Sequence, residues 1–157
     1  MANEPWLSDD QQQVWRDWLS VQAQLPAALN RQLQRDHDLS LQDFEVLVQL
    51  SEAPDERLRL TTLAEHLRWE QSRLSHHVTR MTRRDLVRRE PCADDARGYF
   101  ACLTPTGRRR LVEAAPSHAA TVRALLFDPL SDRAVTDLGA TLTAILTTLA
   151  PAAPNIT

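Results

Sequence analysis

Hydrogen-bond donors crowd one short stretch of the chain, and their spacing places them together on one face of a helix. Leu74, Val78 and Met81 recur within residues 72–84 at steps that predict a helix with one buried stripe. His77 falls near this stripe and is predicted to pack in the core. The rest of the helix surface carries Gln71, Ser72, Arg73, Ser75, His76, Arg80, Arg83 and Arg84. Side chains of these types read base edges and bind phosphates, so this face suits an anionic partner such as double-stranded DNA.

Neighbouring segments would hold this helix in place. Residues 60–67 predict a short preceding helix, which a capping box of Thr62 and Glu65 would start. Residues 86–90 and 99–103 are typical of two strands, and the Pro, Asp and Gly residues between them favour a turn. A helix, a turn, a second helix and a hairpin, in this order, predict a winged helix-turn-helix.

The distribution of charge supports a polyanionic partner although the whole chain is acidic. The formal net charge is −3, which by itself argues against binding to a nucleic acid. Residues 57–110, however, contain thirteen Arg and six acidic residues, whereas the remainder contains five Arg and fifteen acidic residues. The positive charge is therefore concentrated around the donor-rich helix.

Five short motifs follow one another in this region. They are Leu63-Ala64-Glu65-x-Leu67, Ser72-Arg73-Leu74-Ser75-His76, Asp85-Leu86-Val87-Arg88-Arg89, Asp95-x-Arg97 and Leu103-Thr104-x-x-Gly107. Together they resemble the multiple-antibiotic-resistance regulator (MarR) family of bacterial winged-helix transcription factors, and the resemblance covers almost the whole chain. It implies a sequence-specific DNA-binding regulator whose wing inserts Arg97, oriented by Asp95, into a minor groove, where the negative potential is concentrated. Alternating strand geometry lets only one of Arg88 and Arg89 face the DNA, and Arg88 is the candidate.

Long helices are predicted on both sides of the winged helix. They cover residues 8–35 with a kink or interruption at Pro26, residues 40–54, residues 105–126 with a bend at Pro116, and a last helix that begins after Ser131. A capping box of Ser8 and Gln11 would start the first of these helices, Ser40 with Asp43 would cap the second, and Ser131 would cap the last. Three glycines in 157 residues leave few places for tight turns, so the expected fold class is mainly α (α+β). With the resemblance, residues 1–157 are expected to form a single domain, with a winged-helix DNA-binding lobe at 38–104 and a helical dimerisation lobe at 8–36 and 105–150.

The apolar faces of the first and the last two predicted helices exceed what a small winged helix could bury, which predicts an intertwined homodimer. Such a dimer would place one recognition helix per subunit in successive major grooves of a pseudo-palindromic operator and repress by occupying a promoter. The resemblance also implies a small aromatic or phenolic effector that releases the DNA. Trp15, Trp18 and Trp69 could wall its site, with His66 or Arg16 as a donor, or these tryptophans could be plain core.

Several other classes of protein lack support in the sequence. The chain has no Gly-x-Ser-x-Gly, no glycine-rich phosphate loop and no His-Glu-x-x-His, so we do not expect an enzyme, and we expect no cofactor. His76, His77 and the two cysteines lack the paired spacing of metal ligands. No apolar run is long enough to span a membrane, and the N-terminus lacks the pattern of a signal peptide, so a cytoplasmic location is expected.

Two alternatives to an effector-controlled repressor remain open. A winged helix can serve as a protein–protein adaptor, although the Arg-rich face favours DNA. Cys92 and Cys102 could make the chain a thiol-based redox-sensing repressor, although structural thiols in a reduced state are the simpler interpretation.

Overall fold

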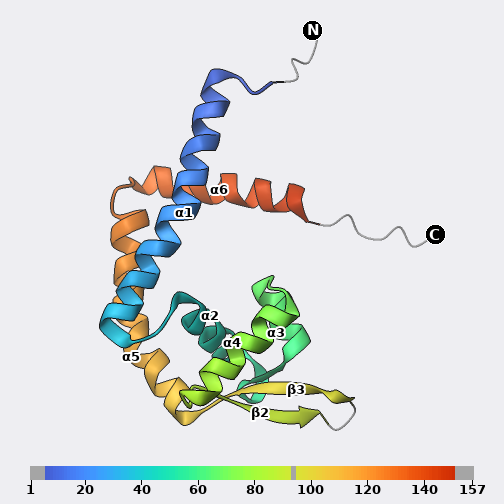
Figure 1. Cartoon of the computed structure of the whole chain (residues 1–157). Coiled ribbons are helices and arrows are strands. Elements are labelled where there is room, and N and C mark those ends of the chain that lie inside the picture. Colours follow the sequence, from blue (N-terminus) through green and yellow to red (C-terminus); the bar gives the residue numbers. More distant parts are fainter. Residues whose placement is uncertain (1–5, 93–94, 151–157) are drawn as a thin grey trace, which may run out of the picture. The chain divides into compact units, whose positions relative to one another are not determined.

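The described chain consists of helices and one small three-stranded sheet (Figure 1). The computed structural model describes residues 6–92 and 95–150, and of residues 95–97 only the backbone. The elements are α1 (Asp9–His37), α2 (Leu41–Glu52), the short 3-10 helix η1 (Pro54–Glu56), β1 (Arg57–Arg59), α3 (Leu60–Leu67), α4 (Gln71–Arg83), β2 (Val87–Cys92), β3 (Asp95–Leu103), α5 (Pro105–Val122), the π-helical turn η2 (Arg123–Phe127) and α6 (Asp132–Leu149). This is the mainly α winged helix-turn-helix that the sequence predicts. In the described part of the chain, no helix is both long and apolar enough to cross a membrane.

The contacts along the chain divide it into two compact units, Met1–Ala119 and Ala120–Thr157. The first unit holds α1 to α4, the sheet and most of α5, and the second holds η2 and α6. The finer division into a winged-helix DNA-binding lobe at 38–104 and a helical dimerisation lobe at 8–36 and 105–150 stays a prediction.

Three of the helices begin at serines that the sequence predicts, Ser8, Ser40 and Ser131. The Ser8 hydroxyl accepts from the Gln11 N–H at 3.2 Å, and the Gln11 side chain accepts from the Ser8 N–H at 3.0 Å. Ser40 and Asp43 form the same reciprocal capping box at the start of α2, with distances of 3.0 and 2.9 Å. Such boxes satisfy backbone donors that a helix leaves unpaired at its N-terminus.

Neither internal proline interrupts its helix. α1 is continuous through Pro26 over 29 residues, and α5 is continuous through Pro116 over 18 residues. The expectation that Pro26 could interrupt the first helix is therefore wrong. Both prolines are exposed, so water can hydrate the carbonyl oxygen whose hydrogen bond each proline removes.

The sheet contains a strand that the sequence did not predict, and this strand explains how α3 starts at the predicted residue without the predicted cap. β1 pairs antiparallel with β3, with Arg59 opposite Phe100, and the strand order is β1-β3-β2. Because this pairing holds the backbone extended as far as Arg59, α3 begins directly afterwards at Leu60, with Arg59 as its N-cap and no side-chain cap. The capping box of Thr62 and Glu65 is therefore wrong, since both residues lie inside the helix. The wing strands are also longer than predicted, with β2 reaching Cys92 and β3 starting at Asp95.

The hydrophobic core holds α4 against α2, α3 and the sheet. Its fully buried side chains include Leu33, Leu39, Val46, Leu47, Leu50, Leu63, Leu74, Val78, Met81 and Val87. Leu74, Val78 and Met81 are the three positions that the sequence pattern assigns to the buried stripe of α4. Burial of all three fixes which way α4 turns its remaining side chains.

Thr104 and Gly107 connect the turn after α4 to the start of α5. The Thr104 hydroxyl lies 2.5 Å from the Asp85 carbonyl oxygen and 3.0 Å from that of Leu86, and it accepts from the Gly107 N–H at 2.9 Å. Gly107 packs so closely that a Cβ atom there would collide with the Leu86 carbonyl oxygen. The Leu-Thr-x-x-Gly motif therefore serves as a backbone junction between β3, α5 and the turn after α4.

Candidate nucleic-acid interface

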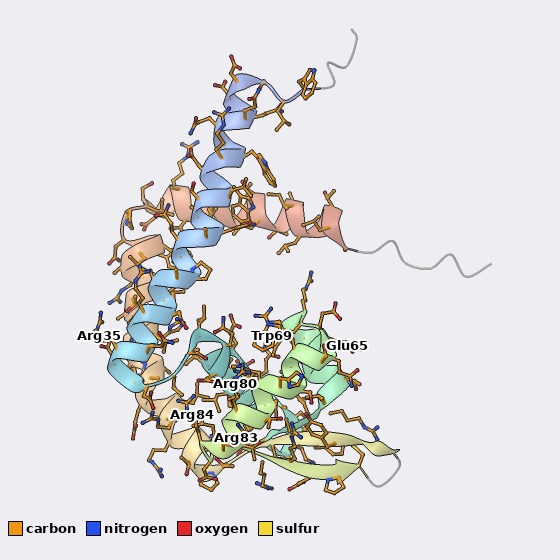
Figure 2. All side chains as sticks on the ribbon, viewed as in Figure 1. Arg35, Glu65, Trp69, Arg80, Arg83 and Arg84 are labelled. Atoms are coloured by element: carbon orange, nitrogen blue, oxygen red, sulfur yellow. The ribbon has the colours of Figure 1, made fainter. Side chains whose placement is uncertain are left out.

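α4 presents a polar face on the side opposite its buried stripe. Leu74, His77, Val78 and Met81 are buried. On the opposite side, in steps of three and four, lie the exposed residues Ser72, His76 and Arg83, with the half-buried Thr79 between them. Figure 2 shows Arg80, Arg83 and Arg84 following one another toward the C-terminal end of the helix.

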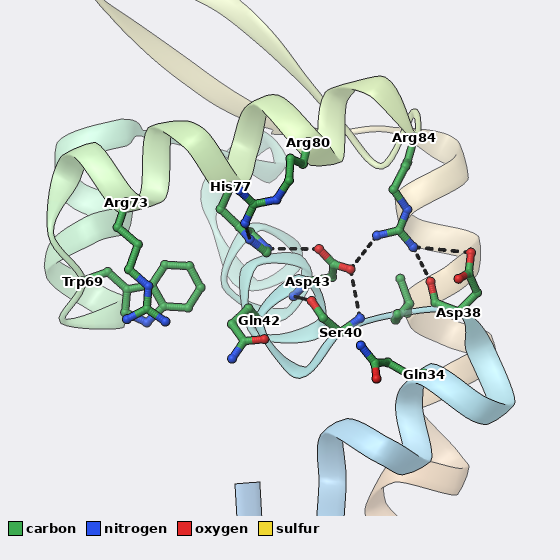
Figure 3. Close-up of a pocket in the computed structure, with 11 residues that line it drawn as sticks. Gln34, Asp38, Ser40, Gln42, Asp43, Trp69, Arg73, His77, Arg80 and Arg84 are labelled. Carbon is green, nitrogen blue, oxygen red and sulfur yellow. Dashed lines mark hydrogen bonds and ion pairs between the residues drawn. The ribbon is translucent and has the colours of Figure 1, made fainter. Parts of the chain in front are cut away.

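One flank of α4 is tied to the N-terminus of α2 by a buried carboxylate (Figure 3). Asp43 accepts from the Ser40 N–H at 2.9 Å, lies 3.0 Å from His77 Nε2 and pairs with Arg84 Nη1 at 2.6 Å. Burial alone would raise the pKa of Asp43, but the contacts with His77, Ser40 and Arg84 outweigh it and hold this pKa well below its usual range. Asp43 is therefore an ionised, fully engaged anchor for the recognition helix.

The same anchor defines how His77 and Arg80 are arranged. Arg80 Nη2 lies 2.8 Å from His77 Nδ1, and a guanidinium can only donate, so Nδ1 must accept. The proton on the imidazole then lies on Nε2, which faces Asp43. The exposed Arg80 side chain lies against His77 (Figure 3). Asp43 therefore orients Arg80, through His77, at the edge of the polar face. The prediction that His77 packs in the core is confirmed.

Arg84 is committed to protein partners. Besides Asp43, it bonds the carbonyl oxygen of Asp38, the left-handed residue that ends α1, and its Nη2 lies 3.6 Å from the Asp38 carboxylate. Arg73, on the same flank, lies with its guanidinium carbon 4.8 Å from the Trp69 ring centroid. Among the predicted contact residues, Arg73 and Arg80 therefore keep exposed positions beside the polar face, whereas Arg84 joins α4 to α1 and α2.

The other flank of α4 is pinned to the wing strands β2 and β3. Arg89 donates to the Ser75 carbonyl oxygen at 3.0 Å, and its guanidinium carbon lies 4.3 Å from the Tyr99 ring centroid. Tyr99 in turn donates to the Ser75 hydroxyl at 3.2 Å. These contacts fix the wing relative to the helix, so the two would approach a partner as one surface.

Arg88 lies on the face of β2 opposite Arg89, as strand alternation requires. Its guanidinium donates to the Glu90 carboxylate, with Nε 3.1 Å from Oε1, and Arg57 reaches the same carboxylate at 3.3 Å. The side chains of Asp95 and Arg97, on which the minor-groove contact depends, lie outside the described residues.

The donor-rich face predicted from the sequence includes Arg83 but not Thr79. Stepping from Ser72 by four, three and four residues reaches His76, Thr79 and Arg83, so the helical periodicity alone was sufficient to find Thr79. Arg83 makes no side-chain hydrogen bond or ion pair with the described residues that would compete with an outside partner, in contrast to Arg84 next to it.

A separate cavity of about 540 Å³ lies in the first unit beside α1, α2 and α3. Its lining is largely apolar and consists of Leu25, Pro26, Leu29, Leu41, Phe44, Glu45, Val48, Gln49, His66, Leu67, Trp69 and His118. His66 and Trp69, two of the predicted effector-site residues, meet here. Trp15 and Trp18 do not line this cavity and are 52% and 39% exposed, so they are not core residues of the described chain.

The cysteines are free and buried. Burial and the neighbouring Glu90 raise the pKa of the Cys102 thiol to about 11, so this sulfur is protonated at neutral pH. A protonated, buried thiol reacts slowly with oxidants, which favours the structural interpretation of Cys102 over a redox sensor.

A winged helix-turn-helix with exposed Ser, His and Arg side chains on its second helix is typical of nucleic-acid-binding proteins. Comparison with known proteins identifies the family. A model of the MarR family matches residues 37–98. The crystal structure of AbsC, a MarR family transcriptional regulator from Streptomyces coelicolor, is 41% identical, with a TM-score of 0.84 over 92% of this chain and 97% of that chain. That of Sco3205, a MarR family transcriptional regulator from the same organism in complex with DNA, is 38% identical, with a TM-score of 0.87 over 97% of this chain and 96% of that chain.

The likeness extends to a transcriptional regulator from a second organism. The crystal structure of the transcriptional regulator BldR from Sulfolobus solfataricus is 27% identical, with a TM-score of 0.74 over 89% of this chain and 96% of that chain. No curated protein matches the chain. The chain belongs to the MarR family, and it is a DNA-binding transcriptional regulator.

Proposed function

We propose that this protein is a homodimeric repressor that reads a pseudo-palindromic operator with α4. The observation that carries the proposal is the exposed face of α4, where Ser72, His76 and Arg83 lie opposite the buried stripe. In the dimer, the two α4 helices enter successive major grooves, about one helical turn apart. Gln71, Ser72, Arg73, Ser75, His76, Arg80 and Arg83 supply the contacts, and Arg88 and the Asp95–Arg97 pair of the wing reach the flanking backbone and minor groove.

The dimer is supported by apolar side chains left uncovered in both units of the chain. On α1 these are Val14, Trp15, Trp18, Leu19 and Val21, which are between 39% and 68% exposed. On α6 they are Ile145, Leu146 and Leu149, which are between 47% and 68% exposed. Large apolar side chains that recur along one helix mark a surface that another chain covers.

The experiment is to recover genomic fragments bound by the purified protein and to measure gel shifts on them with excess non-specific competitor DNA. The proposal expects discrete shifts at nanomolar protein, a symmetric recognition sequence, and less transcript in vitro from a promoter that carries this sequence. Binding to all fragments alike, or more transcript upon binding, contradicts it. If DNA is not bound and the purified chain captures another protein through α4, the adaptor interpretation replaces it.

Control by a small molecule is a second proposal, favoured by the cavity that His66 and Trp69 line. Its volume of about 540 Å³ is in the range of small-molecule sites. Because the cavity lies between α1 and the helices that hold α4, a molecule that fits only one arrangement of these elements shifts the protein toward that arrangement. To release the operator, the ligand must bind the non-binding arrangement more tightly by several kcal/mol. Gel shifts of the operator with increasing ligand measure this release.

A further inference from the structure

We propose that the cavity beside α1, α2 and α3 selects a cationic aromatic ligand, and that it rejects the aromatic and phenolic acids that the family resemblance implies. The inference rests on the proposed control by a small molecule and names the chemical class of that molecule. It depends on the charge of Glu45 and on the hydrogen-bonding groups of Gln49, His66 and His118, which line the cavity.

Glu45 supplies the charge. It lies half-buried on α2 and, with the described residues, makes no side-chain hydrogen bond or ion pair. Burial raises the pKa of Glu45, and the positive charge of Arg73 only partly opposes this. A half-buried carboxylate without a partner gains from a donor that carries positive charge.

His66 and Gln49 pair with each other, whereas His118 offers a lone pair to the ligand. His66 Nδ1 lies 3.1 Å from Gln49 Oε1, an acceptor, so Nδ1 donates. Burial lowers the pKa of His118, so its ring is neutral at neutral pH and has one accepting nitrogen. His118 Nδ1 is buried and has no hydrogen-bond partner among the described residues.

Among the described residues, no Arg or Lys lines the cavity, so a carboxylate would find no cationic side chain in the lining to pair with. Arg73 lies outside the lining, with its guanidinium over the Trp69 ring (Figure 3). An anionic ligand would therefore be repelled by Glu45 without forming an ion pair in the cavity. A flat apolar body, in contrast, fits between Phe44, Leu67 and Trp69, and its ammonium or amidinium group can donate to Glu45.

The test compares three probes that share one ring system, naphthylmethylammonium, naphthylacetamide and naphthylacetate, by isothermal titration calorimetry on the full-length protein without DNA. The ammonium is expected to bind about tenfold or more tightly than the acetate, with the amide between them. Equal affinities, tighter binding of the acetate, or no binding of any probe would overturn the proposal.

Substitutions on α2 then locate the charge. Glu45→Gln should remove most of the preference for the ammonium, whereas Glu52→Gln, which removes the same charge from the same helix outside the cavity, should preserve it. A preference that survives Glu45→Gln overturns the role of Glu45. Gel shifts without probe measure the DNA binding of every variant, so a failed ligand class and a failed DNA-binding proposal give different results.

Discussion

Arg83 and Arg84 are neighbours in the sequence, yet they face different partners. Arg83 stands on the exposed face of α4, whereas Arg84 pairs with the buried Asp43 and with Asp38 at the end of α1. A count of arginines treats them as equal donors, but the helix rotates them by about 100° from one another. Arg83 is therefore available to bind DNA, whereas Arg84 holds α4 in place against α1 and α2.

Alanine substitutions should separate these roles. Arg83→Ala is expected to weaken operator binding and to reduce the salt dependence of binding by about one unit per subunit, because it removes one phosphate contact. Arg84→Ala is expected to leave the salt dependence unchanged and to lower the free energy of unfolding by about 1 to 3 kcal/mol, because Asp43 loses a charged partner. Gel shifts over a range of salt concentrations and urea unfolding measure the two effects. The assignment fails if the two variants exchange these phenotypes.

Asp43 should also make stability depend on pH. Its pKa in the folded chain lies below the ordinary value, so its ionisation stabilises the fold above the unfolded pKa of about 4, and this contribution is lost as the pH falls toward the folded pKa. Asp43→Asn is therefore expected to be clearly less stable than the parent at pH 7, and the difference should shrink below about pH 4. Urea unfolding between pH 7 and pH 3 measures it.

Asp36 provides the control for this measurement. Its carboxylate pairs with Arg35 on the surface, so Asp36→Asn should change stability little at any pH. A constant difference between the parent and Asp43→Asn across the pH range would contradict the assignment of an ionised anchor.

The sequence pattern predicted the helices and caps that depend on contacts between nearby residues. It did not predict the strand that depends on pairing with a distant part of the chain. The buried stripe of α4 and the capping boxes of α1 and α2 follow from residues within one or two helical turns, and the structure confirms them. β1 is three residues long and exists because β3, more than forty positions later, pairs with it. That pairing also overrode the local capping signal in α3, so neither feature could be predicted from nearby residues.

The candidate site shows the same division. The exposed face of α4 was predictable from helical spacing, and the same spacing includes Thr79, which was overlooked. The pairing of Arg84 with Asp43 joins residues 41 positions apart, and the stacking of Arg89 on Tyr99 crosses two strands. Such contacts depend on how the elements pack, which the sequence pattern of one helix does not contain.

The junction between β3 and α5 gives a matched pair of glycine substitutions. Gly107→Ala is expected to lower the free energy of unfolding by about 2 to 3 kcal/mol, because the added Cβ meets the Leu86 carbonyl oxygen. Gly139→Ala on α6 has open space around the added atom and should be neutral or stabilising by up to about 1 kcal/mol. Thermal and urea unfolding at one protein concentration measure both. Equal effects of the two substitutions would contradict a tight junction at Gly107.

For the whole molecule, the exposed apolar side chains of α6 predict a subunit interface. Leu146→Asp should shift the protein from dimer to monomer in sedimentation equilibrium, because a buried, unpaired carboxylate is costly at an interface. Thr147→Asp adds the same charge at the next position, on another side of the helix, and should leave the dimer intact. A parent protein that is monomeric at micromolar concentration, or equal dissociation of both variants, would contradict this interface.

The proposed function depends most on the reading of base pairs by α4. The most direct test measures the binding of the parent protein and of His76→Ala to a series of operators in which each base pair is replaced in turn. The account predicts that His76→Ala loses discrimination, by about 1 to 3 kcal/mol, at one or two positions placed symmetrically in the two half-sites. The remaining positions should keep the preferences of the parent. An unchanged profile, or an equal loss of affinity at every position, would contradict base reading by this face of α4.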